Sequence, residues 1–96
     1  MTTRQCSYIV EGLLMPVILR VKGYRIWFYE ADLDEPPHIH VGKEGNEAKF
    51  WVAPIKVARA GGFRDHELTE IARILAEHQN DILVIWQREQ ERRANR

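Results

Sequence analysis

The feature that most constrains this fold is a change of hydrophobic period near residue 65. Before that point, apolar residues alternate with polar ones in short runs rich in β-branched and aromatic side chains. After it, apolar residues recur at spacings of three and four, from Leu68 to Trp86. A period of two is typical of a half-buried strand, and a period near 3.6 is typical of an amphipathic helix. The chain therefore predicts an α+β domain, in which a sheet is followed by helices that pack on one of its faces.

The part before residue 65 predicts a small antiparallel sheet of four to five strands. The predicted strands cover residues 17–21, 24–30, 38–41 and 47–52, and residues 55–58 can form a short edge strand. Lys22-Gly23 supplies a turn between the first two strands, and the polar segment 42–46 supplies one between the third and fourth. We therefore expect two hairpins, joined by an acidic loop over residues 31–37 that ends in two prolines.

The part after residue 65 predicts either two helices, at about 65–78 and 81–93, or one kinked helix. Asp65 and Glu67 would lie at the positive end of the first helix, where carboxylates are favoured. Asn80-Asp81 has the composition of a second helix start.

Length and composition indicate one small cytoplasmic domain. We expect a single domain over residues 15–96, preceded by an extension over residues 1–14 that shows no regular pattern. No apolar run approaches the length of a membrane span, and the N-terminus lacks the layout of a signal peptide. The single cysteine, Cys6, cannot form an internal disulfide, which agrees with a reducing compartment. We therefore expect no contact with a membrane.

The segment Glu35–Val41 contains the first candidate site. Pro36 and Pro37 hold the backbone extended, so His38 and His40, two positions apart, should lie on one face of a strand. Two imidazoles on one face can begin a metal site. A third ligand could come from the preceding loop or from the start of the first helix, and the candidates are Asp32, Asp34, Glu35 and His66.

The same two histidines also suit general acid–base cleavage of a phosphodiester, as in a ribonuclease. Lys49 or Arg25 would stabilise the extra negative charge on the phosphate. Nucleic-acid bases would stack on aromatic side chains, for which the candidates are Trp27, Tyr29 and Trp51. Strand register decides whether these residues share one face, and the alternative is that the aromatic residues pack under the helices.

A third interpretation needs no catalytic geometry, because the same residues could hold another molecule. Exposed Trp, Tyr and Arg are favoured as interface anchors. The binding candidates are Arg25, Trp27, Tyr29, Trp51 and Glu35. Fourteen basic and fourteen acidic residues give a net charge of zero, so we expect no dominant electrostatic attraction to nucleic acid. RNA, operator DNA and self-association are left open beside a protein partner.

Several short blocks of the sequence resemble a bacterial family catalogued as domain of unknown function 4160. The blocks are Met15-Pro16-Val17-Ile18, Gly23-Tyr24-Arg25-Ile26-Trp27-Phe28-Tyr29, Glu35-Pro36-Pro37-His38-Ile39-His40-Val41, Glu47-Ala48-Lys49-Phe50-Trp51 and Gly62-Phe63. The resemblance covers about residues 15–91. Proteins of this family begin near the position of Met15, which agrees with an extension over residues 1–14.

What the resemblance implies is a role in a pair of proteins. Members are often encoded beside a protein of another family, domain of unknown function 2442, and the pair has been proposed to form a toxin–antitoxin module. The resemblance thus implies a partner protein encoded by a neighbouring gene, with this chain as one half of the module and a candidate for the toxin. It implies no catalytic residues and no cofactor. A divalent metal at His38 and His40 is the cofactor that the residues themselves suggest.

Overall fold

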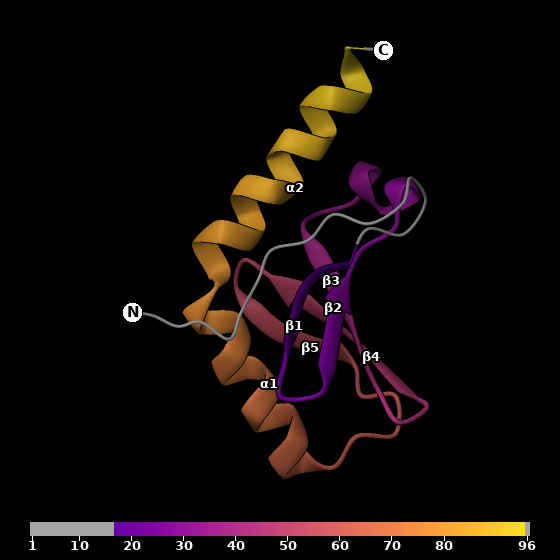
Figure 1. Cartoon of the computed structure of the whole chain (residues 1–96), viewed down its shortest axis with the longest axis vertical. Coiled ribbons are helices and arrows are strands. Elements are labelled where there is room, and N and C mark those ends of the chain that lie inside the picture. The colour runs from indigo at the N-terminus through magenta and orange to yellow at the C-terminus, as the bar shows by residue number, and fades with distance from the viewer. Residues whose placement is uncertain (1–16, 96) are drawn as a thin grey trace.

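The five strands pair with one another in the order in which they follow along the chain. The structure, a computed structural model, describes residues 17–95. The strands are β1 (Val17–Val21), β2 (Tyr24–Trp27), β3 (His38–Lys43), β4 (Asn46–Val52) and β5 (Ile55–Arg59). They form one antiparallel sheet of order β1-β2-β3-β4-β5 (Figure 1). Two helices follow the sheet, so the predicted α+β fold is confirmed.

Two tight turns set the register of the sheet. Lys22-Gly23 links β1 to β2, Glu44-Gly45 links β3 to β4, and φ is positive at all four residues. Positive φ at both central residues belongs to the hairpin turn whose twist matches that of the flanking strands, and glycine adopts it at little cost. Because the second turn needs only two residues, β3 and β4 extend into the segment that we predicted as a polar loop.

The segment between β2 and β3 is partly helical. β2 ends at Trp27, before the predicted end, and the 3₁₀ helix η1 (Glu30–Asp34) occupies most of the predicted loop. The Asp32 side chain accepts a hydrogen bond from the backbone N–H of Tyr29 at 2.9 Å, which closes the first turn of η1. η1 lies beyond the ends of β2 and β3 (Figure 1).

Helices α1 (Asp65–Glu77) and α2 (Gln79–Ala94) lie on one side of the sheet, separated by His78 (Figure 1). α1 begins where predicted. α2 begins at Gln79 rather than at residue 81, and the Gln79 side-chain amide donates a hydrogen bond to the Val52 carbonyl at 2.6 Å. This bond fixes the start of α2 to the end of β4.

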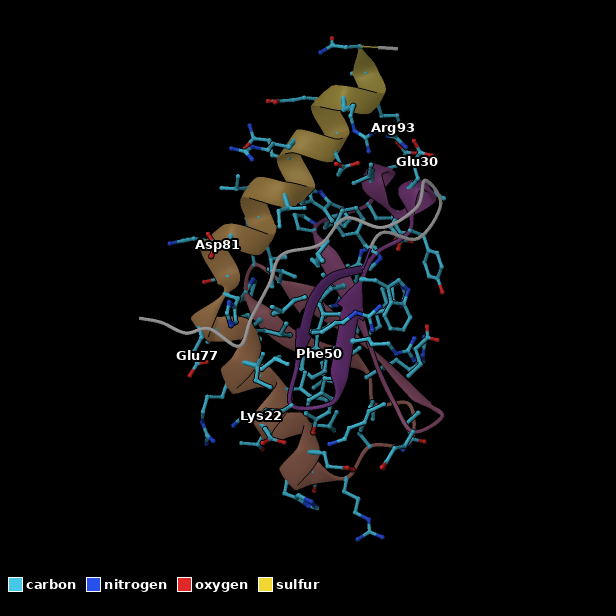
Figure 2. The ribbon with its side chains drawn as sticks, viewed as in Figure 1. Lys22, Glu30, Phe50, Glu77, Asp81 and Arg93 are labelled. Carbon is cyan, nitrogen blue, oxygen red and sulfur yellow. The ribbon has the colours of Figure 1, made fainter. Side chains whose placement is uncertain are left out.

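Alternate residues of the strands face the helices and form the hydrophobic core. We name this side of the sheet the core face, and its members are Tyr24, Ile26, Phe28, Ile39, Val41, Ala48, Phe50 and Val52. The helices contribute Ile71, Ile74, Leu75, Ile82 and Trp86 to the same cluster. Phe50 lies in the middle of this layer (Figure 2). Removal of this apolar surface from water is the main source of stability in such a fold.

The C-terminal half of α2 runs past the sheet and holds η1. The Gln90 side chain donates a hydrogen bond to the Leu33 carbonyl at 2.9 Å, and Arg93 donates one to the Glu30 carbonyl at 3.3 Å. Arg93 also pairs with the Asp34 carboxylate at 2.5 Å. Figure 2 shows Arg93 beside Glu30. The position of η1, and of the residues it carries, therefore depends on a helix far along the chain.

The described residues form one sheet with two helices. Among them, neither α1 nor α2 is both long and apolar enough to cross a membrane. The predicted extension over residues 1–14, with Cys6, lies outside the described residues.

Candidate functional site

The strand register places the predicted site residues together on the side of the sheet opposite the core face. Residues that pair directly across an antiparallel ladder project to the same side. His40 pairs with Trp27 on one side and Lys49 on the other, and His38 pairs with Trp51. We name this surface the histidine face; its members are Arg25, Trp27, His38, His40, Glu47, Lys49, Trp51, Lys56 and Arg59. The alternative that Trp27 and Trp51 pack under the helices is therefore wrong.

Trp27 supports the histidines from one side. Its ring stacks on His40 with 5.7 Å between centroids and 23° between planes, and the Arg25 guanidinium lies 5.4 Å from the Trp27 ring. Tyr29 meets His40 edge-on at 5.0 Å. A Cβ atom at Gly42 would come within 3.0 Å of the Trp27 ring, so glycine is needed there for the ring to lie across β3. Trp27 is buried, and its predicted role as an exposed anchor is replaced by one of packing against His40.

His38 is almost completely enclosed, with 1% of its surface exposed. Its Nδ1 lies 3.0 Å from the Pro36 carbonyl oxygen, and its Nε2 lies 3.3 Å from Oδ2 of Asp32. The ring contacts Trp51 of β4 and also Trp86 of α2. The described pairing of β2 with β3 stops at His40, so His38 has no partner residue on β2.

His40 is buried beside two carboxylates. Its Nε2 lies 3.1 Å from Oδ2 of Asp32, and its Nδ1 lies 3.4 Å from Oε2 of Glu47. The second contact lacks hydrogen-bond geometry, so Nδ1 is a buried nitrogen without a hydrogen-bond partner. Burial lowers the pKa of His40, and this effect outweighs the opposing attraction of Asp32. The imidazole is therefore held towards its neutral form.

Asp32 joins the two imidazoles to η1. Its Oδ2 is close to Nε2 of both histidines and also accepts the backbone N–H of Tyr29. Burial by itself would raise the pKa of Asp32, but the hydrogen bonds from Tyr29 and His40 outweigh it, so the pKa is lowered. Asp32 is thus a carboxylate, and its negative charge is the centre of the cluster.

Of the four candidates for a third metal ligand, Asp32 is the one that meets both histidines. One ligand atom from each of the three residues lies within 4.8 Å of the others. Asp34 instead pairs with Arg93, and His66 is exposed in the first turn of α1. Glu35 lies on the other side of His38, with its Oε1 3.9 Å from Nδ1.

Lys49 and Trp51 form the more accessible part of the histidine face. The Lys49 Nζ lies 3.6 Å from the Glu35 carboxylate and 4.8 Å from the centre of the Trp51 ring. Trp51 is half-buried and lines an apolar pocket of about 170 Å³. The other lining residues are Pro36, Pro37, Ala53, Pro54 and Lys56. Glu35, Lys49 and Trp51 therefore border one surface, as expected for a binding site.

The sequence interpretation missed Glu47, Gly42 and Lys56 as members or supports of this surface. In the sequence, Glu47 and Lys56 look like ordinary polar residues of strands. Only the strand register shows that Glu47 lies beside His40 and that Lys56 lies beside Trp51. Gly42 read as part of a turn. The period of two continues past His40. If we had predicted a turn of only two residues after it, Gly42 would have been placed in β3.

In chemical terms, the site has a buried part and a surface part. The buried part is a cluster of Asp32, His38 and His40, which can share protons or coordinate a cation. The surface part carries a lysine and an aromatic ring beside an apolar pocket. Of the predicted catalytic residues, Lys49 retains partial exposure while both imidazoles are closed off.

A family model matches most of the sheet and helices of this chain. No curated protein and no solved structure is similar to this chain. The family model described as "Domain of unknown function (DUF4160)" matches residues 23–87, which include every member of the histidine face and Asp32. The match is narrower than the predicted span of 15–91 but covers more than half of the chain, so the resemblance is confirmed: the chain belongs to the DUF4160 family.

Proposed function

We propose that this protein is one half of a bacterial two-gene module of toxin–antitoxin type and acts by holding its partner protein on the histidine face. The observation that carries the proposal is the apolar pocket beside Trp51, whose walls include three prolines and the stem of Lys56. A rigid apolar pocket next to a half-buried tryptophan is suited to an anchoring side chain of another protein.

Charge on the histidine face favours a partner with acidic groups. Arg25 and Lys56 are exposed, and neither has a carboxylate partner within the part of the chain that the structure describes. Lys49 and Arg59 are paired with Glu35 and Glu47 at 3.6 Å and 3.9 Å. Lys56 lines the apolar pocket, and Arg25 lies farther along the same face. Together they are complementary to a surface that offers apolar and acidic side chains.

The partner that fits the family is the protein encoded by the neighbouring gene, of the domain of unknown function 2442 type. In this proposal the present chain is the candidate toxin, and the partner covers the histidine face. RNA or operator DNA is the competing occupant, because unpaired cations and an aromatic ring also suit a phosphate backbone with stacked bases.

The alternative of a histidine-dependent ribonuclease or metal-dependent phosphodiesterase has less support. His40 pairs in register with Lys49, which would place a cation beside the acid–base group. Against it, His38 is 1% and His40 7% exposed, and a general acid or base must come within hydrogen-bond reach of the substrate. The burial of both imidazoles therefore favours the binding proposal over the enzymatic one.

The test is to coexpress the full chain with the product of its neighbouring gene and to measure the affinity of the purified pair. Trp51→Ala should weaken the complex at least tenfold, and Arg25→Ala should weaken it less. Arg73→Ala, an exposed arginine on α1, is the matched control and should leave the affinity unchanged.

Three outcomes would contradict the proposal. The first is a complex whose affinity is unchanged by both Trp51→Ala and Arg25→Ala. The second is the absence of a complex together with binding of RNA or DNA whose affinity falls steeply with salt concentration, which would assign the face to nucleic acid. The third is growth arrest with loss of total RNA that disappears in the His38→Ala/His40→Ala double variant, which would support the enzymatic alternative.

A further inference from the structure

We propose that Asp32, His38 and His40 bind a divalent transition-metal ion of the zinc type, and that Glu47 and the Pro36 carbonyl orient the two imidazoles for it. The metal would fasten η1, which carries Asp32, to β3, which carries both histidines. The inference stands on the geometry of this cluster and does not depend on the partner proposed above.

The two ring nitrogens of His38 have different neighbours. Its Nδ1 lies 3.0 Å from the Pro36 carbonyl oxygen. A carbonyl can only accept, so Nδ1 carries the proton and the neutral ring has its lone pair on Nε2. The nitrogen lies 3.3 Å from Oδ2 of Asp32, which is itself an acceptor. Two acceptor atoms this close together in an enclosed place favour a cation between them.

His40 has an Nδ1 atom that is buried without a hydrogen-bond partner. This nitrogen lies 3.4 Å from Oε2 of Glu47, while Nε2 lies 3.1 Å from Oδ2 of Asp32. If Nε2 binds a metal, the proton moves to Nδ1, and a small rotation of the exposed Glu47 side chain would let its carboxylate accept that proton in a hydrogen bond. A carboxylate or carbonyl behind each metal-bound imidazole is the usual arrangement at zinc sites. The Pro36 carbonyl already holds His38 in this way, and the Glu47 carboxylate lies close enough to Nδ1 of His40 to do the same once a metal is bound.

The spacing of the donor atoms also suits a zinc ion. Zinc–ligand bonds of about 2.0–2.1 Å at the tetrahedral angle place neighbouring donors about 3.3 Å apart. The two nitrogen-to-Oδ2 distances in the cluster are 3.3 Å and 3.1 Å, and all three ligand atoms lie within 4.8 Å of one another. Two of the three donor separations thus already match those around a bound ion, and the two imidazole nitrogens, at most 4.8 Å apart, need only a small shift.

Two imidazoles and one carboxylate select the class of ion. Imidazole suits zinc, copper, iron and nickel, whereas magnesium and calcium prefer oxygen ligands alone. Zinc sites with three protein ligands complete their coordination with water. The Asp32 side chain retains 16% of its exposure, which leaves a path for that water.

The test uses the full chain with Cys6→Ser as the background, because a cysteine thiolate binds zinc by itself. The protein is freed of metal with EDTA, dialysed, and titrated with zinc and then with cobalt at neutral pH. We expect binding of one ion per chain, a higher melting temperature, and the intense visible absorption of four-coordinate cobalt. Nitrogen NMR of the wild-type rings should show both Nε2 signals shifting on zinc binding, which requires no variant at the site to fold.

Variants then test the ligand set. Asp32→Asn, His38→Gln and His40→Gln should each weaken zinc binding at least tenfold, and His66→Gln, an exposed histidine, should not change it. Glu47→Gln should weaken it by about 10–100-fold, as found for groups that orient a ligand, while Glu44→Gln in the neighbouring turn should have no effect.

The proposal is overturned if zinc does not bind, or binds without moving the Nε2 signals of His38 and His40. It is also overturned if Asp32→Asn, shown to fold by its circular dichroism, binds zinc as tightly as the background protein. An imidazolium signal from His38 in the metal-free protein that persists unchanged when zinc is added would instead assign the cluster to an ion pair with Asp32.

Discussion

The two faces of the sheet share one backbone but bury different kinds of side chain. On the core face, every buried side chain is apolar or, in Tyr24, largely so, and two helices cover it. On the histidine face, residues one position along the same strands include two imidazoles, and these too are buried. An antiparallel sheet with a solvated second face usually carries exposed polar residues there. The enclosed histidines indicate that this face is organised around a site rather than merely exposed to water.

The energetic consequences of burial also differ between the faces. Burial of an apolar side chain on the core face is favourable by itself, at about 25 cal/mol for each Å². Burial of an imidazole or a carboxylate is unfavourable unless hydrogen bonds or opposite charge compensate for the lost water. On the histidine face that compensation comes from η1, through Asp32. The core face stabilises the fold, whereas the histidine face depends on the position of η1.

The sharpest test of this comparison uses two neighbouring residues that project to opposite faces. Phe50→Ala on the core face should lower the free energy of unfolding by about 3–5 kcal/mol, because it opens a cavity under the helices. Trp51→Ala should cost much less, since Trp51 is only half-buried, while it weakens partner binding. Urea unfolding followed by circular dichroism measures both. Equal losses of stability for the two variants would contradict the division into two faces.

The next test compares two aspartates of η1. Asp32→Ala should lower the free energy of unfolding by about 1–3 kcal/mol, because the Tyr29 N–H and the His40 ring lose their acceptor in a buried place. Asp34→Ala removes a carboxylate whose partner is the partly exposed Arg93, and should cost about 1 kcal/mol at most. Both are measured by urea unfolding in EDTA. An Asp34→Ala variant as unstable as Asp32→Ala would show that η1 is held mainly by α2.

A smaller effect is expected from pH. Burial holds the pKa of His40 below that of the unfolded chain, about 6.5, so the unfolded chain takes up a proton that the folded protein does not. Stability should therefore fall as the pH is lowered from about 7 through the lowered pKa of His40. At lower pH, protonation of Asp32 removes a further contribution, which is present above its unfolded pKa of about 3.9.

The measurement is the free energy of unfolding in urea between about pH 7.5 and pH 5, with EDTA present. His38 and Glu47 also face His40, so the control is His40→Gln, which removes only the titrating ring. The variant should have the flatter profile over this range. A wild-type profile no steeper than that of His40→Gln would contradict the expectation.

The smallest effect on stability should come from the charged surface of the histidine face. Lys49→Gln breaks a 3.6 Å pair with the exposed Glu35 carboxylate and should change the free energy of unfolding by about 0–1 kcal/mol. The same variant should measurably weaken partner binding, because Lys49 covers Trp51 at the edge of the pocket. If Lys49→Gln lowers stability as much as Asp32→Ala, Lys49 supports the fold rather than the binding surface.

Much of the fold could be predicted because its signals are local. Runs of β-branched and aromatic residues, several with a period of two, located all five strands, and the change of period at Asp65 located the start of the helices within the chain. The errors lay at element ends, where β2 stops at Trp27 and α2 starts at Gln79. Those limits depend on tertiary contacts, in η1 for the first and with the Val52 carbonyl for the second.

The candidate site was predictable only in part. The diproline and the spacing of His38 and His40 indicated two imidazoles on one face, which the structure has. Four residues were candidates for the third metal ligand, and the sequence offered no reason to prefer Asp32 among them. Its selection needs the turn of η1 that Tyr29 and Asp32 close together, and that turn is held by the far end of α2.

By itself, the sequence determined the elements, their order and the alternation of residues within each strand. These follow from short-range sterics and from the hydrophobic pattern, which act within a few residues. Only the tertiary structure decided that Trp27, His40 and Lys49 stand in one row across three strands, and that both imidazoles meet Asp32. Strand register is a property of paired strands, and a slip of one residue would have turned the same histidines towards the core.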